Sequence, residues 1–169
     1  PQLVNLAKSA GVAANIQKQA AAMSREMDMS LQWSDLAWVR KHWKGPVIVK
    51  GLLTPADALQ ALNAGADGIV ISNHGGRQLE CAPSPLEQLP AIADAVQGRM
   101  QLLVDGGVRR GSDIAKALAL GADAVLLGRA PLYGLASRGP QGVAEVLTIL
   151  RSEFEIALRL LGANRATSL

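Results

Sequence analysis

Four short apolar runs lie between residues 47 and 128, and none of them alternates polar with apolar positions. They occupy residues 47–50, 68–72, 101–105 and 124–128. Uninterrupted apolar runs of this length are typical of strands that are covered on both faces, as in parallel sheets. The pattern therefore predicts four buried strands that run parallel to one another.

A helix-length segment follows each of the first three apolar runs. Two of these segments open with a hydroxyl residue before a proline, Thr54-Pro55 and Ser84-Pro85, which is a start signal of helices. A third helix is expected from near Ser112 to just before Gly121. Further helices are expected at residues 34–43 and, after a Gly/Pro break at residues 138–142, at residues 143–161, where apolar residues recur at helical spacing.

The segment from residue 51 to residue 67 recurs 56 residues further along the chain. One period covers two strand–helix units, and strands joined by helices form a parallel sheet. Such a sheet is either open and doubly wound or closed as a barrel. The matching positions are Gly51, Asp57, Ala61, Leu62, Gly65, Ala66 and Asp67, which recur as Gly107, Asp113, Ala117, Leu118, Gly121, Ala122 and Asp123.

The positions of the glycine-rich turns separate these two folds. An open sheet usually binds phosphate at its first strand–helix turn through a G-x-G-x-x-G motif, which is absent from the first turn here. The turns that contain glycine and arginine follow the last two strands instead, as in the phosphate sites of barrels. We therefore predict an α/β fold that is the C-terminal half (strands 5–8) of a TIM (βα)8 barrel.

This prediction divides the chain into three parts. Residues 1–46 form a loop or helical segment that leads into the barrel, residues 47–162 form four βα units, and residues 163–169 form a C-terminal tail. A full barrel needs about 250 residues, so the other four units are expected upstream of Pro1. The methionine-containing segment before residue 30 is expected to pack on the barrel rim or, alternatively, to meet a membrane or a partner.

Composition narrows the class of protein. With 49% hydrophobic and 18% charged residues in 169, the chain has material for a core and is not disordered. The net charge is only +3 and no basic block is present, which argues against a nucleic-acid partner. The single cysteine excludes an internal disulfide and indicates a reducing compartment. No apolar run is long enough to span a membrane, and no metal-ligand motif is present.

The segment from Ser72 to Gln78, Ser-Asn-His-Gly-Gly-Arg-Gln, has the densest candidate chemistry. It follows the second strand, and the carboxyl ends of barrel strands form the active face. His74 can exchange a proton near neutral pH, and the planar fork of Arg77 suits a carboxylate. Lys50 ends the first strand at the same face, where its charge would meet an anionic ligand. The alternatives are a surface turn with a structural histidine and a lysine that reaches solvent.

A phosphate cradle is predicted from the turns after the last two strands. It comprises Gly106, Gly107, Val108 and Arg109 in one turn and Gly128 and Arg129 in the other, where backbone N–H groups and guanidinium groups favour anions. Asp105 is acidic and is expected to face a sugar hydroxyl instead of the phosphate. Asp67 and Asp123 precede two strands at the opposite end of the barrel and are expected to stabilise the fold. Cys81 and His42 are expected to be bystanders.

With these motifs, residues 30–162 resemble the FMN-dependent α-hydroxy-acid oxidases and dehydrogenases. The resemblance is carried by Lys50-Gly51 and by residues 72–79, 105–111 and 127–129, in order and spacing. Residues 22–28, 81–85 and 132–136 look most like the L-mandelate dehydrogenase branch of that family. The resemblance implies an FMN cofactor and the oxidation of an L-2-hydroxy acid, mandelate- or lactate-like, to the 2-keto acid.

The resemblance also implies a role for each site residue. His74 would be the catalytic base and would contact substrate, Arg77 would bind the substrate carboxylate, and Lys50 would lie at the N1/O2 edge of the flavin. Ser72 would contact the flavin ring and Asp105 the ribityl chain. The remaining cofactor-binding residues, most of them at the phosphate, would be Gly106, Gly107, Val108, Arg109, Gly128 and Arg129.

Further partners follow from the same resemblance. The upstream half of the barrel would supply an aspartate that orients His74, a second carboxylate-binding arginine and substrate-contacting tyrosines. A homo-tetramer is expected, located in the cytoplasm and in peripheral contact with the cytoplasmic face of a membrane. Two alternatives remain open: a flavin-free, phosphate-binding TIM-barrel isomerase or synthase, and a non-catalytic half-barrel fragment.

Overall fold

In the computed structural model, Leu36–Leu169 form one compact unit. The structure describes residues 30–169. The predictions for the methionine-containing segment and for the stretch 22–28 therefore lie outside the described residues. Within residues 30–169, no helix combines the length and the hydrophobicity needed to cross a membrane.

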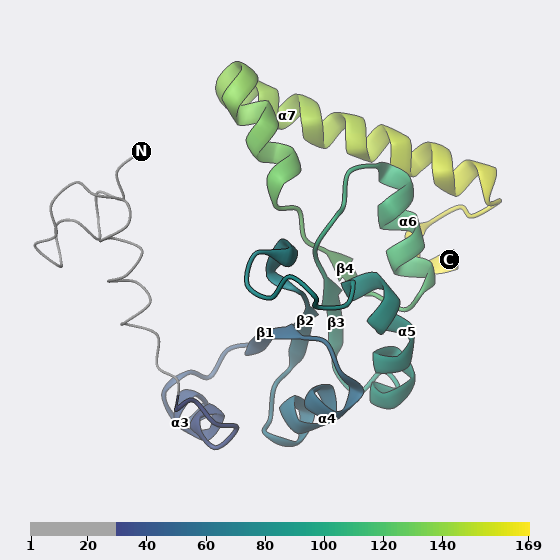
Figure 1. The fold of residues 1–169 in the computed structure, drawn as a ribbon. Coiled ribbons are helices and arrows are strands. Elements are labelled where there is room, and N and C mark those ends of the chain that lie inside the picture. Colours follow the sequence, from purple (N-terminus) through teal and green to yellow (C-terminus); the bar gives the residue numbers. More distant parts are fainter. Residues whose placement is uncertain (1–29) are drawn as a thin grey trace, which may run out of the picture. The chain divides into compact units, whose positions relative to one another are not determined.

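Four parallel strands form one sheet in which each strand lies beside the next in the sequence (Figure 1). They are β1 (Ile48–Leu52), β2 (Gly68–Ile71), β3 (Gln101–Val104) and β4 (Ala124–Val125). The four predicted strands are confirmed, and their order is that of consecutive strands in a barrel. The fourth strand is shorter than predicted: its pairing with β3 covers only Ala124 and Val125, followed by a hydrogen bond from the Leu126 N–H to the Val104 carbonyl at 2.9 Å.

Three helices link the strands and cover one side of the sheet (Figure 1). They are α4 (Pro55–Asn63), α5 (Pro85–Val96) and α6 (Gly111–Ala119). The predicted helix starts are correct: the Thr54 hydroxyl accepts the N–H of Asp57 at 3.1 Å, and the Ser84 hydroxyl caps α5 in the same way. A shorter helix, α3 (Asp35–His42), precedes the sheet and ends one residue before the predicted end.

The long helix α7 (Arg129–Leu160) consists of two helices that meet at a break (Figure 1). Non-helical backbone at Arg138 and Gly139 confirms the predicted Gly/Pro break, but the segment before it, for which no helix was predicted, is helical as well. Glycines allow the two parts to touch: a Cβ on Gly134 would lie 2.3 Å from the Gly142 carbonyl oxygen. Two 3-10 turns complete the fold, η1 (His74–Gly76) and η2 (Ala166–Ser168).

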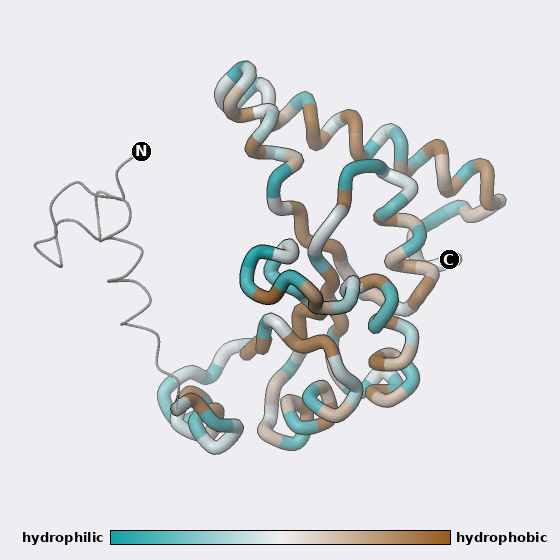
Figure 2. Tube along the Cα trace, viewed as in Figure 1, coloured by the Kyte–Doolittle hydropathy of each residue, from teal (hydrophilic) through white to brown (hydrophobic). Residues whose placement is uncertain are grey.

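The core lies between the sheet and helices α4 to α6, where the apolar positions of the strands gather (Figure 2). Strand β2 is buried along its whole length, as predicted. The prediction of burial on both faces is wrong for β1, since Ile48 is 48% exposed. Among the described residues β1 pairs with β2 alone, so that its other edge lacks a neighbour. The largest fully buried apolar side chains are Ile69, Ile71, Leu89, Ile92 and Val96.

Asp67 and Asp123 join neighbouring strands at the end where the strands begin. The Asp67 carboxylate accepts the N–H of Val47, and the Asp123 carboxylate accepts the N–H of Leu102, each at 2.7 Å. The hydrogen bond from Val47, together with the nearby Arg40 guanidinium, holds the pKa of Asp67 below its usual value of 3.8. Both carboxylates therefore serve the fold, as predicted, and lie at the end of the sheet opposite His74.

Candidate active site

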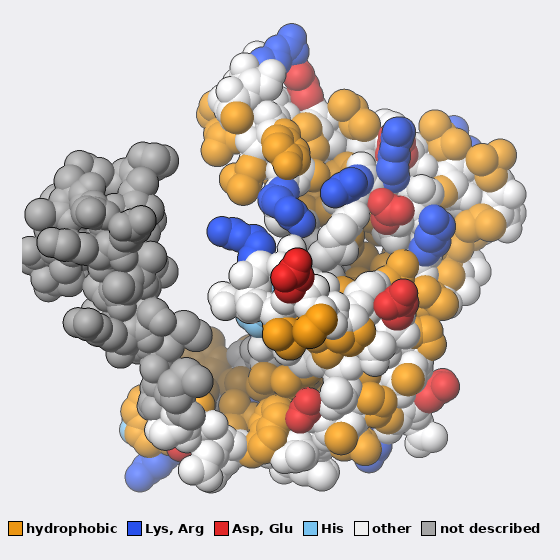
Figure 3. Space-filling view, viewed as in Figure 1, with side chains coloured by type: hydrophobic (Ala, Val, Ile, Leu, Met, Phe, Trp, Pro, Cys, Tyr) orange, Lys and Arg blue, Asp and Glu red, His pale blue; other side chains and the backbone are white. Residues whose placement is uncertain are grey.

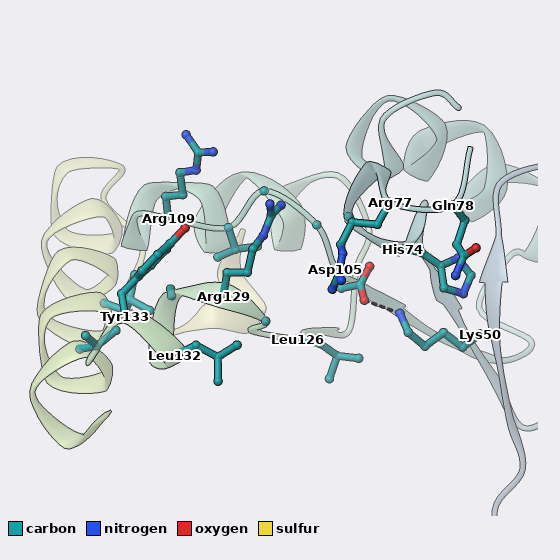
Figure 4. A pocket seen from close by; sticks show the side chains of 18 of the residues that line it. Lys50, His74, Arg77, Gln78, Asp105, Arg109, Leu126, Arg129, Leu132 and Tyr133 are labelled. Atoms are coloured by element: carbon teal, nitrogen blue, oxygen red, sulfur yellow. Dashed lines mark hydrogen bonds and ion pairs between the residues drawn. The ribbon is translucent and has the colours of Figure 1, made fainter. Parts of the chain in front are cut away.

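A cavity of about 1130 Å3 opens at the carboxyl ends of the strands (Figure 4). Ten of the eleven predicted site residues line it, although they come from four separate turns of the sequence. They are Lys50, His74, Arg77, Asp105, Gly106, Gly107, Val108, Arg109, Gly128 and Arg129. The eleventh, Ser72, is fully buried behind the cavity wall. The fold thus brings these ten residues together, and Ser72 contacts the site through its hydrogen bond from Lys50.

The cavity has two chemically different ends. Figure 4 places Lys50, His74 and Gln78 at one end and Arg109, Arg129 and Tyr133 at the other, with Asp105 between them. Lys and Arg side chains also gather on the upper half of the face seen in Figure 3. An elongated anionic ligand with its charged group at the arginine end would match this arrangement.

Lys50 is held inside the site by two partners. Its ammonium group donates to the Ser72 hydroxyl at 2.8 Å and forms an ion pair with Oδ2 of Asp105 (Figure 4). Lys50 was predicted to end its strand, but β1 continues to Leu52. The lysine side chain is 43% exposed and lines the cavity, where these two oxygens compensate its charge. Oδ1 of the same aspartate is buried and has no hydrogen-bond partner in the described part of the chain. A buried, unpaired carboxylate oxygen leaves one strong acceptor available for a donor from a ligand.

The backbone of His74 is fixed in a left-handed conformation, with φ at 56°. Its N–H donates to the Ser72 hydroxyl at 3.1 Å, so one buried hydroxyl group contacts both Lys50 and the histidine loop. Asn73 fixes the other side of the turn: its Oδ1 accepts the N–H of Gly75 at 3.0 Å, and its Nδ2 donates to the Pro83 carbonyl at 3.3 Å. The imidazole therefore projects from a turn whose backbone is held on both sides.

The arginine end differs in one respect from the predicted cradle. The N–H groups of Arg109 and Arg110 both donate to the Asp113 carboxylate at 3.0 Å, so they are already paired. Arg109 can therefore meet an anion only through its guanidinium group. Arg110 does not line the cavity and pairs with Glu153 of α7 at 3.2 Å. Gly107 and Gly128 face open space, since a Cβ on either would meet no atom within 4 Å.

One wall of the cavity was not predicted from the sequence. It is apolar and comes from the turn before α7 and from both parts of that helix: Leu126, Leu132, Tyr133, Val146, Ile149 and Leu150. Tyr133, the only tyrosine of the chain, is 72% exposed. The helical spacing of Val146 and Leu150 indicated an apolar face, but nothing in the pattern indicated what that face borders.

The residues expected to be bystanders lie away from the cavity. Cys81 and His42 are both exposed, and Nδ1 of His42 donates a hydrogen bond to the Trp38 carbonyl oxygen at 2.8 Å. Within residues 30–169, no three His, Cys, Asp or Glu side chains group closely enough to hold a metal ion.

The family model of FMN-dependent dehydrogenases matches residues 3–169. The chain belongs to this family. It is 53% identical over 169 residues to an (S)-mandelate dehydrogenase of Pseudomonas putida, covering all of this chain and 42% of that protein. It is 52% identical over 143 residues to an L-lactate dehydrogenase of Stenotrophomonas maltophilia, which covers 85% of this chain and 38% of that one.

A solved structure supports the same assignment. The crystal structure of a monotopic membrane protein, (S)-mandelate dehydrogenase, superimposes with a TM-score of 0.88 at 51% identity and covers the whole chain and 44% of that protein. The chain thus spans less than half the length of the relatives it matches. The predicted fold, the C-terminal half of a TIM barrel, and the predicted cofactor, FMN, are both confirmed.

The residues of the cavity fit FMN. The unpaired Oδ1 of Asp105 offers an acceptor to a ribityl hydroxyl, and the guanidinium groups of Arg109 and Arg129 offer donors to a phosphate. Gly107 and Gly128 leave the space in which a phosphate would approach the backbone. The Lys50 ammonium group, at the opposite end, suits an electron-rich ring edge. The cavity thus has an acceptor for a ribityl hydroxyl and donors for the phosphate and for one edge of the flavin ring.

Proposed function

We propose that this chain supplies the FMN site and the catalytic base of an enzyme that oxidises an L-2-hydroxy acid to the corresponding 2-keto acid. The observation that carries the proposal is the presence of His74, Arg77 and Lys50 on one cavity with two phosphate-suited arginines. A phosphate-binding isomerase would need only the arginine end. The family match likewise does not favour the flavin-free or non-catalytic alternatives.

Each residue has a separate task in this proposal. Arg77 binds the substrate carboxylate through its planar fork and orients the hydroxyl-bearing carbon. His74 accepts a proton, either from the hydroxyl oxygen in a hydride route or from the α-carbon in a carbanion route. FMN, when bound, supplies the acceptor for the two electrons that the substrate loses. Lys50 would place a positive charge at the edge of the flavin ring, where negative charge develops when FMN is reduced.

The family resemblance and the named relatives suggest mandelate or lactate as substrate. The relatives that share about half of their residues with this chain include both a mandelate and a lactate dehydrogenase. We place this chain nearer the mandelate branch because of residues 81–85 and 132–136.

A peripheral location on the cytoplasmic face of the membrane is part of the proposal. It is supported by the similarity to a monotopic membrane protein. A membrane quinone would then be the electron acceptor in place of dioxygen. The proposal also includes the upstream half of the barrel and a homo-tetramer, both taken from the family resemblance.

The decisive experiment is anaerobic flavin reduction. The purified protein is expected to be yellow and to lose its flavin absorbance when an L-2-hydroxy acid is added, whereas the D-enantiomer leaves the absorbance unchanged. A colourless protein, or a yellow one that no L-2-hydroxy acid bleaches, would contradict the proposed function. Fractionated cells assayed with oxygen or with a quinone-like dye test the acceptor: activity confined to the soluble fraction, with stoichiometric peroxide, would overturn the membrane proposal alone.

A further inference from the structure

Gly51 lies against the imidazole of His74. A Cβ atom added to Gly51 would lie 2.7 Å from Cε1 of His74, 3.5 Å from Nε2 and 3.7 Å from Nδ1. Carbon atoms in contact are normally separated by about 3.5–4.0 Å. Any side chain at this position would therefore displace the ring by about 1 Å, unless the backbone moved instead.

The backbone on both sides of this contact is restrained. Gly51 is bulged out of the ladder between β1 and β2, because Lys50 pairs with Val70 and Leu52 with Ile71. Its φ of 100° lies in a region that residues with a side chain rarely adopt. On the other side, Ser72 and Asn73 hold the His74 turn, as described above. The imidazole ring is thus the part of this contact that can move.

We propose that Gly51 is a positioning residue that sets the place of the His74 imidazole beside Lys50. The absence of a side chain lets the ring rest on the β1 backbone directly after the lysine. This inference rests on the proposed function, in which His74 is the catalytic base. Since a reacting group displaced by about 1 Å can lose about 10²-fold in rate, a methyl group at Gly51 should impair proton transfer without touching the substrate or FMN.

Gly65 provides the matched control. It also has a left-handed backbone, with φ at 90°, but a Cβ there would meet only Arg40 Nε, at 3.8 Å, at the opposite end of the sheet. Gly51→Ala and Gly65→Ala therefore introduce similar backbone strain, and only the first meets His74. We expect Gly51→Ala holoenzyme to keep its FMN and to lose about 10²-fold in kcat/KM, with Gly65→Ala close to wild type.

Two readouts separate positioning from general damage. The Cε1–H signal of His74 in a carbon–proton correlation spectrum, identified by its loss in His74→Asn, should move in Gly51→Ala and stay in place in Gly65→Ala. In a His74→Asn background, Gly51→Ala should cost less than about threefold further activity, because the ring it acts on is gone. If Gly51→Ala does not fold, the double variant should recover folded protein, since the shorter asparagine removes the contact.

An unmoved His74 signal in Gly51→Ala, an equal loss of activity in both backgrounds, or an equal loss in Gly65→Ala would each overturn the inference. Failure of the double variant to recover folded protein would do the same. A wild-type holoenzyme that bound FMN and oxidised no hydroxy acid would refute the proposed function instead. In that case the position of the His74 signal would still decide whether Gly51 sets the ring.

Discussion

Replacement of His74 is the most direct test of the proposed catalytic base, provided that the new residue can adopt the same backbone conformation. His74 has φ at 56°, a left-handed conformation that asparagine adopts more readily than alanine. His74→Asn therefore removes the imidazole at little conformational cost. His74→Ala removes the same group but lacks the short polar side chain that favours this conformation.

The two variants should consequently differ in stability and agree in kinetics. Loss of a general base typically lowers the rate by about 10²–10⁴-fold, and both variants should fall in that range. His74→Asn should have a higher Tm than His74→Ala, because asparagine adopts the left-handed region more readily. Gln97, the other described non-glycine residue with positive φ (53°), lies at the end of α5 and supplies the control. Gln97→Ala, which like His74→Ala places an alanine in the left-handed region, should keep full activity.

The assay measures kcat/KM with an L-2-hydroxy acid and an artificial electron acceptor, alongside FMN content from the flavin absorbance and Tm from thermal unfolding. FMN content should match wild type in all three variants, because His74 is assigned to proton transfer and not to cofactor binding. Near-normal activity of His74→Asn with full FMN would refute the assignment of the base. A loss of activity that followed Tm instead of the imidazole, with Gln97→Ala as impaired as His74→Ala, would refute the reasoning as well.

Three further predictions concern other parts of the chain. Arg77→Met should raise KM strongly and Arg77→Lys should restore it only partly, because lysine lacks the planar fork; equal kinetics of Lys and Arg would show that no two-point contact is made. Arg129→Ala should weaken FMN binding by about 10–100-fold in a fluorescence titration and leave riboflavin binding unchanged, with Arg110→Ala, outside the cavity, as control. The lowered pKa of Asp67 contributes stability that is present above pH 3.8 and lost as the pH falls below it. Between pH 7 and pH 3, the free energy of unfolding measured with urea should therefore fall less in Asp67→Asn than in wild type. The control Asp94→Asn, at an exposed position, should behave like wild type. A similar pH response in the two variants would contradict the prediction.

The sequence was sufficient to predict the sheet and the grouping of the site residues because both follow from local patterns. Apolar runs mark the strands, and hydroxyl–proline pairs mark the starts of α4 and α5. Once the strands are known to be parallel, the turns after them must share one edge of the sheet. His74, Asp105 and Arg129 follow three different strands, and their meeting in one cavity needs no more information than that.

Other features could not be predicted because they depend on contacts between distant segments. The apolar wall of the cavity arises because α7 turns back on itself where Gly134 meets Gly142, which places Val146 and Leu150 beside the site. The pairing of the Arg109 N–H with Asp113 depends on the exact geometry of one turn. The contact of Gly51 with His74 joins two strand ends, and neither residue alone signals it.

The equivalent positions of the 56-residue repeat show that the two ends of the sheet have different roles. At the end where the strands begin, Asp67 and its counterpart Asp123 make the same contact, each accepting an N–H of the neighbouring strand at 2.7 Å. At the carboxyl ends, Gly51 and its counterpart Gly107 share a left-handed backbone and differ in surroundings: the first meets His74, and the second faces open space in the cavity. The same backbone geometry thus makes room for a side chain in one turn and for a ligand in the other. The repeated strand–helix unit determines the backbone conformation of these two turns. Their chemistry differs because a side chain packs on the glycine in one turn, whereas the glycine in the other faces the cavity.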